Sequence, residues 1–317
     1  MEPPAPLTQE QKQFFLKNGY LKLSRCFTRE QAAQVTEGVW TRLGMSADDK
    51  STWTQHKINM PSHRTFDAAA LCAARLVRHL RALRRRRARR RGTLAVLARQ
   101  PDREPGHGRG RGKPVPPREL DNWHVDGDFF VHYLDSPEQA LLRCAAPGGG
   151  TMLCPDAVPK IARWLYEHPE GVSPRMVPRG HPDFTKEKNL KWYMELARGC
   201  DEFVEASGEV GDVFLLHPLM MHSATSNALR NARIITNPPV SFRAPQVFDR
   251  GEKEGDYSLV ELKTIQSVGG LDKMKGWRPT MPREAIVPMR VRIQEEMKRK
   301  ELQRLEEAKG VAAVATA

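Results

Sequence analysis

A histidine and an aspartate separated by one residue are the side chains best placed to bind a metal. His124 and Asp126 have this spacing, and further histidines follow downstream. In a strand, residues i and i+2 point to the same face, so both side chains can reach one ion. Two imidazoles and one carboxylate form the facial triad that holds non-haem Fe(II) in oxygenases. We therefore expect His124 and Asp126 to bind a metal together with a second histidine from a distant strand.

Two histidines compete to complete this set. Residues 211–223 read as a turn followed by a buried strand, and they contain both His217 and His222. The two histidines are an odd number of residues apart, so on one regular strand they would face opposite sides, and only one of them could contact the metal. His132 lies six residues beyond Asp126, about 20 Å away along an extended strand. We expect His132 to line a substrate entrance instead of binding the metal.

A triad of this kind leaves part of the metal's coordination sphere open. On an octahedral ion three positions remain, of which two suit a chelating 2-oxo acid and one suits O2. A 2-oxo acid also needs a fixed cation for its far carboxylate. Arg233 follows His222 by eleven residues, at the start of a stretch that reads as a strand.

These segments resemble the phytanoyl-CoA dioxygenase-like family of Fe(II)/2-oxoglutarate oxygenases. The resemblance rests on residues 121–130, on the Gly-Asp turn and apolar strand before His222, and on the strand at Arg233. It favours His222 over His217 and implies that His124, Asp126 and His222 bind Fe(II), with no catalytic residue beyond the metal centre. It also implies that Arg233 binds 2-oxoglutarate.

The same resemblance implies a fold and a reaction. The expected fold is mainly β with flanking helices, a double-stranded β-helix (jelly roll, cupin-like). The expected reaction is hydroxylation of a C–H bond in a small molecule or acyl-type metabolite, with Fe(II), 2-oxoglutarate and O2. The turn at residues 148–151 resembles a family turn near the co-substrate, which makes Thr151 a second candidate contact for 2-oxoglutarate. Relatives often carry serine where this chain has Ala224, and residues near 257–261 resemble fungal-type members of the family.

Composition limits the classes of protein that the chain can be. It has 317 residues, 39% of them hydrophobic, and a mean hydropathy of −0.58. No apolar run approaches the roughly 20 residues of a membrane-spanning helix, and the first residues lack the pattern of a secretory signal. Five scattered cysteines without a Cys-x-x-Cys pair indicate reduced thiols and no zinc site. We expect a cytoplasmic protein with no membrane partner.

The positive charge is concentrated in one segment. Residues 75–111 contain fourteen arginines and two acids, a net charge of +12, so of the total of +13 only +1 belongs to the remaining residues. The whole of residues 68–112 is poor in aromatic residues. Three interpretations are open: non-native coding sequence, a disordered insertion, or a nucleic-acid-binding tract. We do not expect a nucleic-acid partner.

A second irregularity follows Leu142. Members of the resembled family continue there with an apolar strand, whereas this chain has only residues 143–147 before its Gly-rich turn. This pattern predicts the loss of about one strand. The alternative function is therefore a catalytically inactive jelly-roll protein, or the product of a damaged or misread gene.

The chain reads as a single oxygenase domain with several parts. We expect an N-terminal helical part at 1–67, the anomalous segment at 68–112 and a jelly-roll core at 113–245. A C-terminal helical part follows at 246–309 and a tail at 310–317. Residues 169–198 read as loop-rich, and two interpretations are open: a substrate lid whose basic groups attract an acidic substrate, or a solvated surface loop.

Local patterns also predict individual helices. Capping boxes begin helices at Thr8 and Thr28, and a third helix is expected at 157–167. A charged helix is expected at 283–309, interrupted by Pro288.

Overall fold

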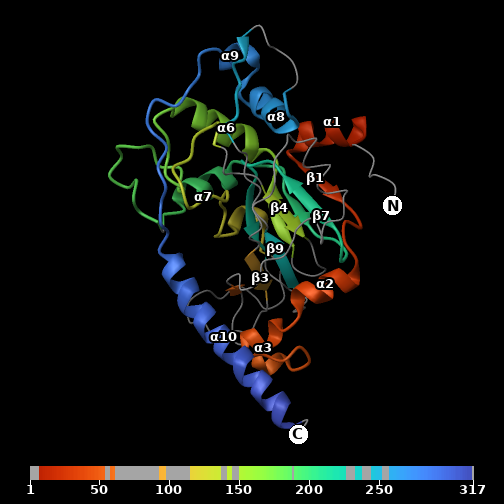
Figure 1. The fold of residues 1–317 in the computed structure, drawn as a ribbon. Helices are drawn as coiled ribbons and strands as arrows, with labels where there is room; N and C mark the ends of the chain where they lie inside the picture. Colours follow the sequence, from red (N-terminus) through yellow and green to blue (C-terminus); the bar gives the residue numbers. More distant parts are fainter. Residues whose placement is uncertain are drawn as a thin grey trace.

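The computed structural model describes residues 7–53, 58–60, 93–97, 115–136, 141–144, 150–187, 189–225, 233–237, 244–251 and 257–315. Figure 1 shows short strands in the middle of the molecule with helices around them. The helices of four or more residues are α1 (Gln9–Asn18), α2 (Arg29–Thr36), α3 (Val39–Leu43), α6 (Ala157–Glu167), α7 (Lys191–Arg198), α8 (Leu259–Val268), α9 (Leu271–Met274) and α10 (Arg290–Ala315). Two 3₁₀ turns occupy Lys50–Thr52 and Pro117–Glu119.

The described strands form three antiparallel sheets. In the first, β7 (Val213–Leu216) lies between β1 (Tyr20–Leu23) and β4 (Leu141–Cys144). In the second, β3 (Thr93–Leu97) lies between β2 (Ile58–Met60) and β9 (Arg233–Asn237). In the third, β5 (Thr151–Cys154) lies between β6 (Val204–Ala206) and β8 (Met221–Ala224).

The expected antiparallel sheets with flanking helices are present, but β-structure does not predominate among the described residues. The strands are three to five residues long, whereas α10 alone spans 26 residues. The reason is that helices from both ends of the chain pack around the sheets. Figure 1 shows α6 and α8 at one end of the strands and α3 with α10 at the other.

The N-terminal helices begin where the sequence predicts them. The hydroxyl oxygens of Thr8 and Thr28 each accept a hydrogen bond from the backbone N–H of the third helical residue. The side-chain oxygen of the glutamine at that position accepts one from the threonine backbone N–H, so both capping boxes form. Gly19 ends α1 in the left-handed conformation, with φ of 72°. The second predicted helix is divided in two, because Gly38 is also left-handed and separates α2 from α3.

Parts of the chain outside residues 113–245 also build the sheets. β1 comes from the N-terminal part, where Tyr20 pairs with Leu216. β3 comes from the arginine-rich segment, which otherwise lies outside the described residues, so its interpretation stays a prediction. The predicted loss of a strand after Leu142 also stays a prediction, because β4 ends at Cys144 and residues 145–149 are not described.

The C-terminal helix differs from its predicted limits. It begins at Arg290, after Pro288, and continues to Ala315, so helix replaces most of the expected tail. α10 packs against α3 through Arg42 and Glu301, whose side chains form a buried ion pair of 2.5 Å.

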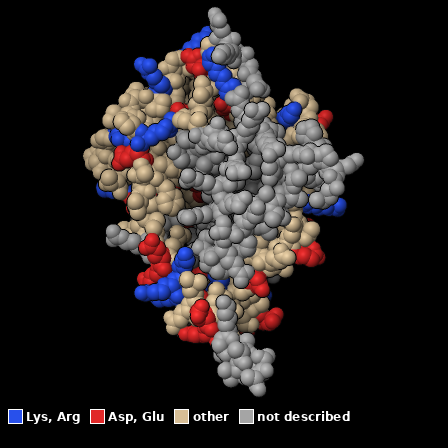
Figure 2. All heavy atoms as spheres, viewed as in Figure 1, with Lys and Arg blue, Asp and Glu red and all other residues tan. Residues whose placement is uncertain are grey.

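Two further observations concern the surface. No helix among the described residues is long and apolar enough to cross a membrane. Figure 2 shows the Lys and Arg side chains of the described residues interleaved with Asp and Glu on the face in view.

Candidate metal centre

The position of His222 is fixed by strands on both sides of β8. On one side His222 is paired with Leu153 of β5. On the other side it forms an isolated antiparallel bridge with His124, with backbone N–H···O distances of 3.1 and 2.9 Å. Directly opposed residues of antiparallel strands point to the same face. The two imidazoles therefore emerge side by side, with ring centroids 4.4 Å apart.

Asp126 completes a compact group of three side chains. Its Oδ1 atom lies 3.5 Å from Nε2 of His124 and 3.5 Å from Nε2 of His222. Ligand atoms about 2.1 Å from one ion and at right angles are about 3 Å apart. The three donor atoms therefore fit around one metal ion after a small contraction, and they are the donor types of the facial triad.

Backbone carbonyl groups orient both rings. Nδ1 of His124 is 2.7 Å from the oxygen of Asn122, and Nδ1 of His222 is 2.9 Å from the oxygen of Met220. A carbonyl oxygen only accepts, so each Nδ1 must carry a proton. In the neutral rings the lone pair is then on Nε2, which faces the carboxylate of Asp126. Such an arrangement requires a positive charge between the three groups, either a metal ion or added protons.

The electrostatics of Asp126 follow from the same geometry. Burial raises the pKa of this carboxyl, but the positive charge that the two imidazoles carry when protonated and their hydrogen bonds lower it by more, so the pKa lies well below its usual value. The His222 side chain is 1% exposed, whereas those of His124 and Asp126 are 24% and 37% exposed. Asp126 is thus ionised, and the group is anchored in the core through His222 and accessible at His124 and Asp126.

Tyr193 of α7 supports the metal segment, although sequence reasoning did not assign it to the site. Its hydroxyl donates to the oxygen of Pro174 at 3.2 Å, and its oxygen lies near the backbone N–H of Val125, the residue between His124 and Asp126. Burial raises the pKa of Tyr193, so the hydroxyl keeps its proton. The lid prediction covered these residues as loop, but residues 191–198 form helix α7.

Of the two residues expected to bind the co-substrate, Thr151 has a described side chain and Arg233 does not. Thr151 is buried and opposes Ala224 in β8, while Leu153 opposes His222. Alternate residues of a strand share a face, so Thr151 lies on the face of His222, about 7 Å along the sheet. Arg233 is the first residue of β9 and pairs with Leu97. Its side chain lies outside the described residues.

His217 lies away from the metal group because it is not in the same strand as His222. It follows the end of β7, and a turn separates it from β8. Its Nδ1 accepts from the N–H of Leu219 at 3.1 Å, and its Nε2 lies 3.1 Å from the hydroxyl oxygen of Thr264. Burial lowers the pKa of His217 to about 3. It is a neutral core residue that joins the β7–β8 turn to α8.

His132 does not line an entrance as expected. The chain turns at Gly127, and the His132 ring is fully buried with Nε2 2.7 Å from the oxygen of Gly127. Gly127 has a φ of 114°, and the Phe130 ring occupies the space a side chain would need. The expected distance was wrong because it assumed an extended strand after Asp126.

Several basic groups of the expected lid already have acidic partners. Arg179 pairs with Glu284 at 3.1 Å, and Lys186 pairs with Asp183 at 2.6 Å. Arg175 donates to the backbone oxygen of Glu187. These contacts hold the segment in place and reduce the charge it can offer an acidic ligand.

Comparisons with known proteins give solved structures only. No family model matches the chain, and no curated protein is similar to it in sequence. The solved structures include HygX from Streptomyces hygroscopicus with nickel and 2-oxoglutarate, at 15% identity, 75% coverage of this chain, 88% of that chain and a TM-score of 0.39. EctD from S. alaskensis with bound Fe has 17% identity, coverages of 82% and 85%, and a TM-score of 0.41.

A third solved structure is similar to the same extent. The non-heme alpha ketoglutarate dependent carbocyclase SnoK, from nogalamycin biosynthesis, has 13% identity, coverages of 80% and 92%, and a TM-score of 0.40. At these TM-scores and identities the similarities carry no conclusion about this chain, whose site stands on its own geometry.

Proposed function

We propose that this protein is an Fe(II)- and 2-oxoglutarate-dependent dioxygenase that hydroxylates a C–H bond of a small molecule or acyl-type metabolite. The observation that carries the proposal is the group formed by His124, Asp126 and His222, whose three donor atoms lie within 4.8 Å of one another. Two imidazoles and one carboxylate leave open positions on the metal, as oxygen-activating iron centres require.

Each of the three residues has a separate part in holding the ion. Asp126 supplies the negative charge that offsets the charge of Fe(II), and its low pKa keeps it ionised at neutral pH. His124 and His222 supply neutral nitrogens whose orientation is set by the carbonyl groups of Asn122 and Met220. When bound, Fe(II) with 2-oxoglutarate would supply the oxidation of the substrate C–H bond by O2, with release of succinate and CO2.

Arg233 and Thr151 belong to the co-substrate part of the proposal. A guanidinium group suits the far carboxylate of 2-oxoglutarate because it can donate two parallel hydrogen bonds. Thr151 is supported by its place on the face of His222. The double-stranded β-helix is also part of the proposal, supported by the antiparallel sheets and by the sequence resemblance to the phytanoyl-CoA dioxygenase-like family.

Metal and co-substrate binding can be tested without knowing the substrate. Fe(II) would be titrated into the protein under anaerobic conditions, followed by 2-oxoglutarate, and the charge-transfer absorption of the chelate would be recorded. Succinate formation would then be measured after addition of O2. His124→Ala should abolish both signals, whereas Arg233→Ala should weaken 2-oxoglutarate binding by about tenfold to a hundredfold, the loss of one charged hydrogen-bonded contact.

A matched control is His181→Ala, because His181 is exposed and lies in a turn outside the metal group. This variant should behave as the wild type. If the wild type binds Fe(II) no better than His124→Ala, the proposed function is wrong. If Fe(II) binds but 2-oxoglutarate gives no absorption change, the metal centre stands and the co-substrate assignment is wrong.

A further inference from the structure

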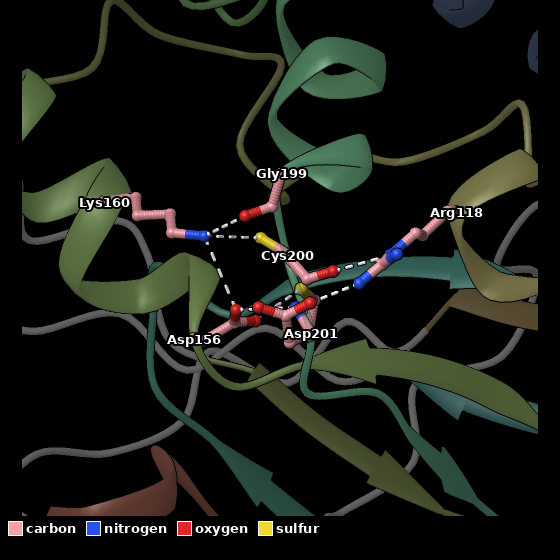
Figure 3. A network of polar contacts seen from close by, with 7 residues as sticks. Arg118, Asp156, Lys160, Gly199, Cys200 and Asp201 are labelled. Carbon is pink, nitrogen blue, oxygen red and sulfur yellow. Dashed lines mark hydrogen bonds and ion pairs between the residues drawn. The ribbon is translucent and has the colours of Figure 1, made fainter.

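A second group of reactive side chains lies away from the proposed iron centre, at the junction of β5, α6 and α7. Cys154 is the last residue of β5, Asp156 precedes α6, and Cys200 follows the end of α7. The two sulfurs and a carboxylate oxygen of Asp156 lie within 4.8 Å of one another. Figure 3 shows the side chains of Asp156 and Cys200 close to one another, with Lys160 reaching in from α6.

Lys160 is bound by three acceptors in this group. Its Nζ lies 2.5 Å from the oxygen of Gly199, 3.3 Å from the sulfur of Cys200 and 3.5 Å from Oδ2 of Asp156. An ammonium group has three N–H donors and no acceptor, so the three contacts match a protonated lysine. Cys200 is therefore an acceptor beside a fixed positive charge.

Cys154 has the opposite role. Its sulfur lies 3.2 Å from Oδ1 of Asp156 and also faces the sulfur of Cys200, so two acceptors compete for its single proton, which it keeps. The pKa values agree with this asymmetry. The Cys154 hydrogen bond and then Lys160 lower the pKa of Cys200 against burial, while contact with Cys200 and burial raise the pKa of Cys154.

The turn that carries Cys200 is held in place by backbone contacts. Asp201 donates its N–H to Oδ2 of Asp156 at 2.9 Å, and Arg118 donates to the oxygen of Cys200 at 2.8 Å. Arg118 also pairs with the carboxylate of Asp201. These anchors hold the two sulfurs together although 46 residues separate them in the sequence.

We do not expect this group to bind a metal ion. The ammonium of Lys160 already occupies the side from which a cation would approach Cys200 and Asp156, and it supplies the positive charge that these groups need. What remains is a polarised sulfur next to a protonated thiol. This is the arrangement of an attacking and a resolving cysteine.

We propose that Cys200 and Cys154 form a redox-active pair, in which a peroxide oxidises Cys200 and Cys154 converts the product to a disulfide linking β5 to the end of α7. This proposal is independent of the function proposed above. Both sulfurs are buried, but the side chains of Lys160 and Asp156 are 34% and 23% exposed. These partly exposed groups contact the buried sulfurs, and they mark the side from which we propose that hydrogen peroxide enters.

The chemistry balances with hydrogen peroxide as the oxidant. The Cys200 thiolate attacks one peroxide oxygen, an S–O bond forms, the O–O bond breaks, and hydroxide leaves to take a proton from solvent. Cys200 is then a sulfenic acid, oxidised by two electrons. The sulfur of Cys154 attacks it, an S–S bond forms and the S–O bond breaks. The departing oxygen leaves as water with the Cys154 proton.

The test uses the wild-type chain. The reduced protein would be treated with increasing hydrogen peroxide, unfolded in the presence of a thiol-blocking reagent, digested without reduction and analysed by mass spectrometry. The expected product is a peptide pair joined through Cys154 and Cys200, two hydrogens lighter than the reduced peptides. Cys26 serves as the internal control, because it is also buried and its sulfur donates to the oxygen of Leu23.

Variants separate the two roles. In Cys154→Ser, the sulfenic acid should persist on Cys200 and be trapped by dimedone, whereas in Cys200→Ser, Cys154 should stay reduced at the same dose. Lys160→Met should slow oxidation of Cys200 several-fold. Because Cys154 is fully buried, the wild-type result decides the matter if a variant fails to fold.

Three results would overturn the proposal. One is that Cys154 and Cys200 both stay reduced at peroxide doses that oxidise Cys26. Another is that either of them links to a different cysteine. The third is that the purified protein retains zinc on the two sulfurs and that this zinc protects them.

Discussion

His124 and His222 exchange two backbone hydrogen bonds across an isolated antiparallel bridge, although 98 positions separate them in the chain. This bridge, and not contact between the side chains, sets the spacing of the two imidazoles. The same residue, His222, is paired on its other side with Leu153 of β5. The proposed metal group therefore lies at the edge of a sheet, with His222 in a strand and the other two residues in the segment beside it.

Loss of His222 should remove metal binding with little change in fold. We expect His222→Ala to weaken binding of Fe(II), or of Co(II) as a stable substitute, by more than about 100-fold, since loss of groups that only orient ligands already costs 10- to 100-fold. Isothermal titration with Co(II) would measure this. An affinity within a few-fold of the wild type would show that His222 is not a ligand, and His181→Ala gives the matched control.

Removing the hydroxyl of Tyr193 should loosen the metal segment. In Tyr193→Phe the N–H of Val125 loses the polar oxygen that lies near it, while the buried ring remains. One hydrogen bond contributes about 1 kcal/mol, so metal affinity should fall by about fivefold. The same titration would detect this, and thermal unfolding of the metal-free protein would report any general loss of stability. An unchanged affinity would restrict Tyr193 to packing.

Because His217 is buried without a charge, the free energy of unfolding should decrease in mild acid. Its pKa is about 3 in the folded protein and 6.5 when unperturbed, so the unfolded chain binds a proton that the folded chain excludes. Its contribution to stability is therefore complete above pH 6.5 and is lost as the pH falls toward 3. The free energy of unfolding should decrease by up to about 1.4 kcal/mol for each pH unit below 6.5.

The substitution that isolates this effect is His217→Gln, which retains a polar group beside Thr264. Urea unfolding of the variant between pH 7 and pH 5 should show a shallower loss of stability than the wild type. Buried His132 has a pKa lowered to about 4 and remains in both proteins, so it does not affect the difference. Equal slopes for the two proteins would refute the assignment.

The ion pair between α3 and α10 should respond differently to single and double substitution. The side chains of Arg42 and Glu301 are 3% and 2% exposed, and Oε1 of Glu301 has no hydrogen-bond partner among the residues described. Glu301→Ala leaves a buried guanidinium group and should cost about 3 to 5 kcal/mol. The double variant Arg42→Met/Glu301→Leu should recover most of this loss, because neither charge is then buried.

Urea unfolding followed by circular dichroism would compare the three proteins. Burial raises the pKa of Glu301 despite the neighbouring Arg42, which agrees with a pair that is incompletely compensated. If the double variant is as unstable as Glu301→Ala, relief of the buried charge does not restore stability. The packing of α10 on α3 then depends on the specific contact between Arg42 and Glu301.

Features encoded within a few residues could be predicted from the sequence. The capping boxes at Thr8 and Thr28 form because each threonine bonds to a backbone group only three positions away. Helix α6 lies where its apolar spacing predicts it. His124 and Asp126 are brought together over a single intervening residue, so their proximity also needs no distant contact.

Features that depend on distant contacts could not be predicted. His217 and His222 were treated as residues of one strand with opposite faces. They belong to different segments, because a turn separates His217, after the end of β7, from His222 in β8. The extended path assumed from Asp126 to His132 was wrong because the chain turns at Gly127, which has a positive φ and has the Phe130 ring where a side chain would lie. Helix α7, with Tyr193, was likewise read as loop.

The sequence by itself determined which side chains are present to bind a metal and which of them are neighbours along the chain. Only the tertiary structure decided that His222 joins them and that Cys154 meets Cys200. The physical reason is that hydrogen bonds between strands and burial of apolar surface depend on which segments pack together. A single sequence records the participants of such contacts but not their pairing.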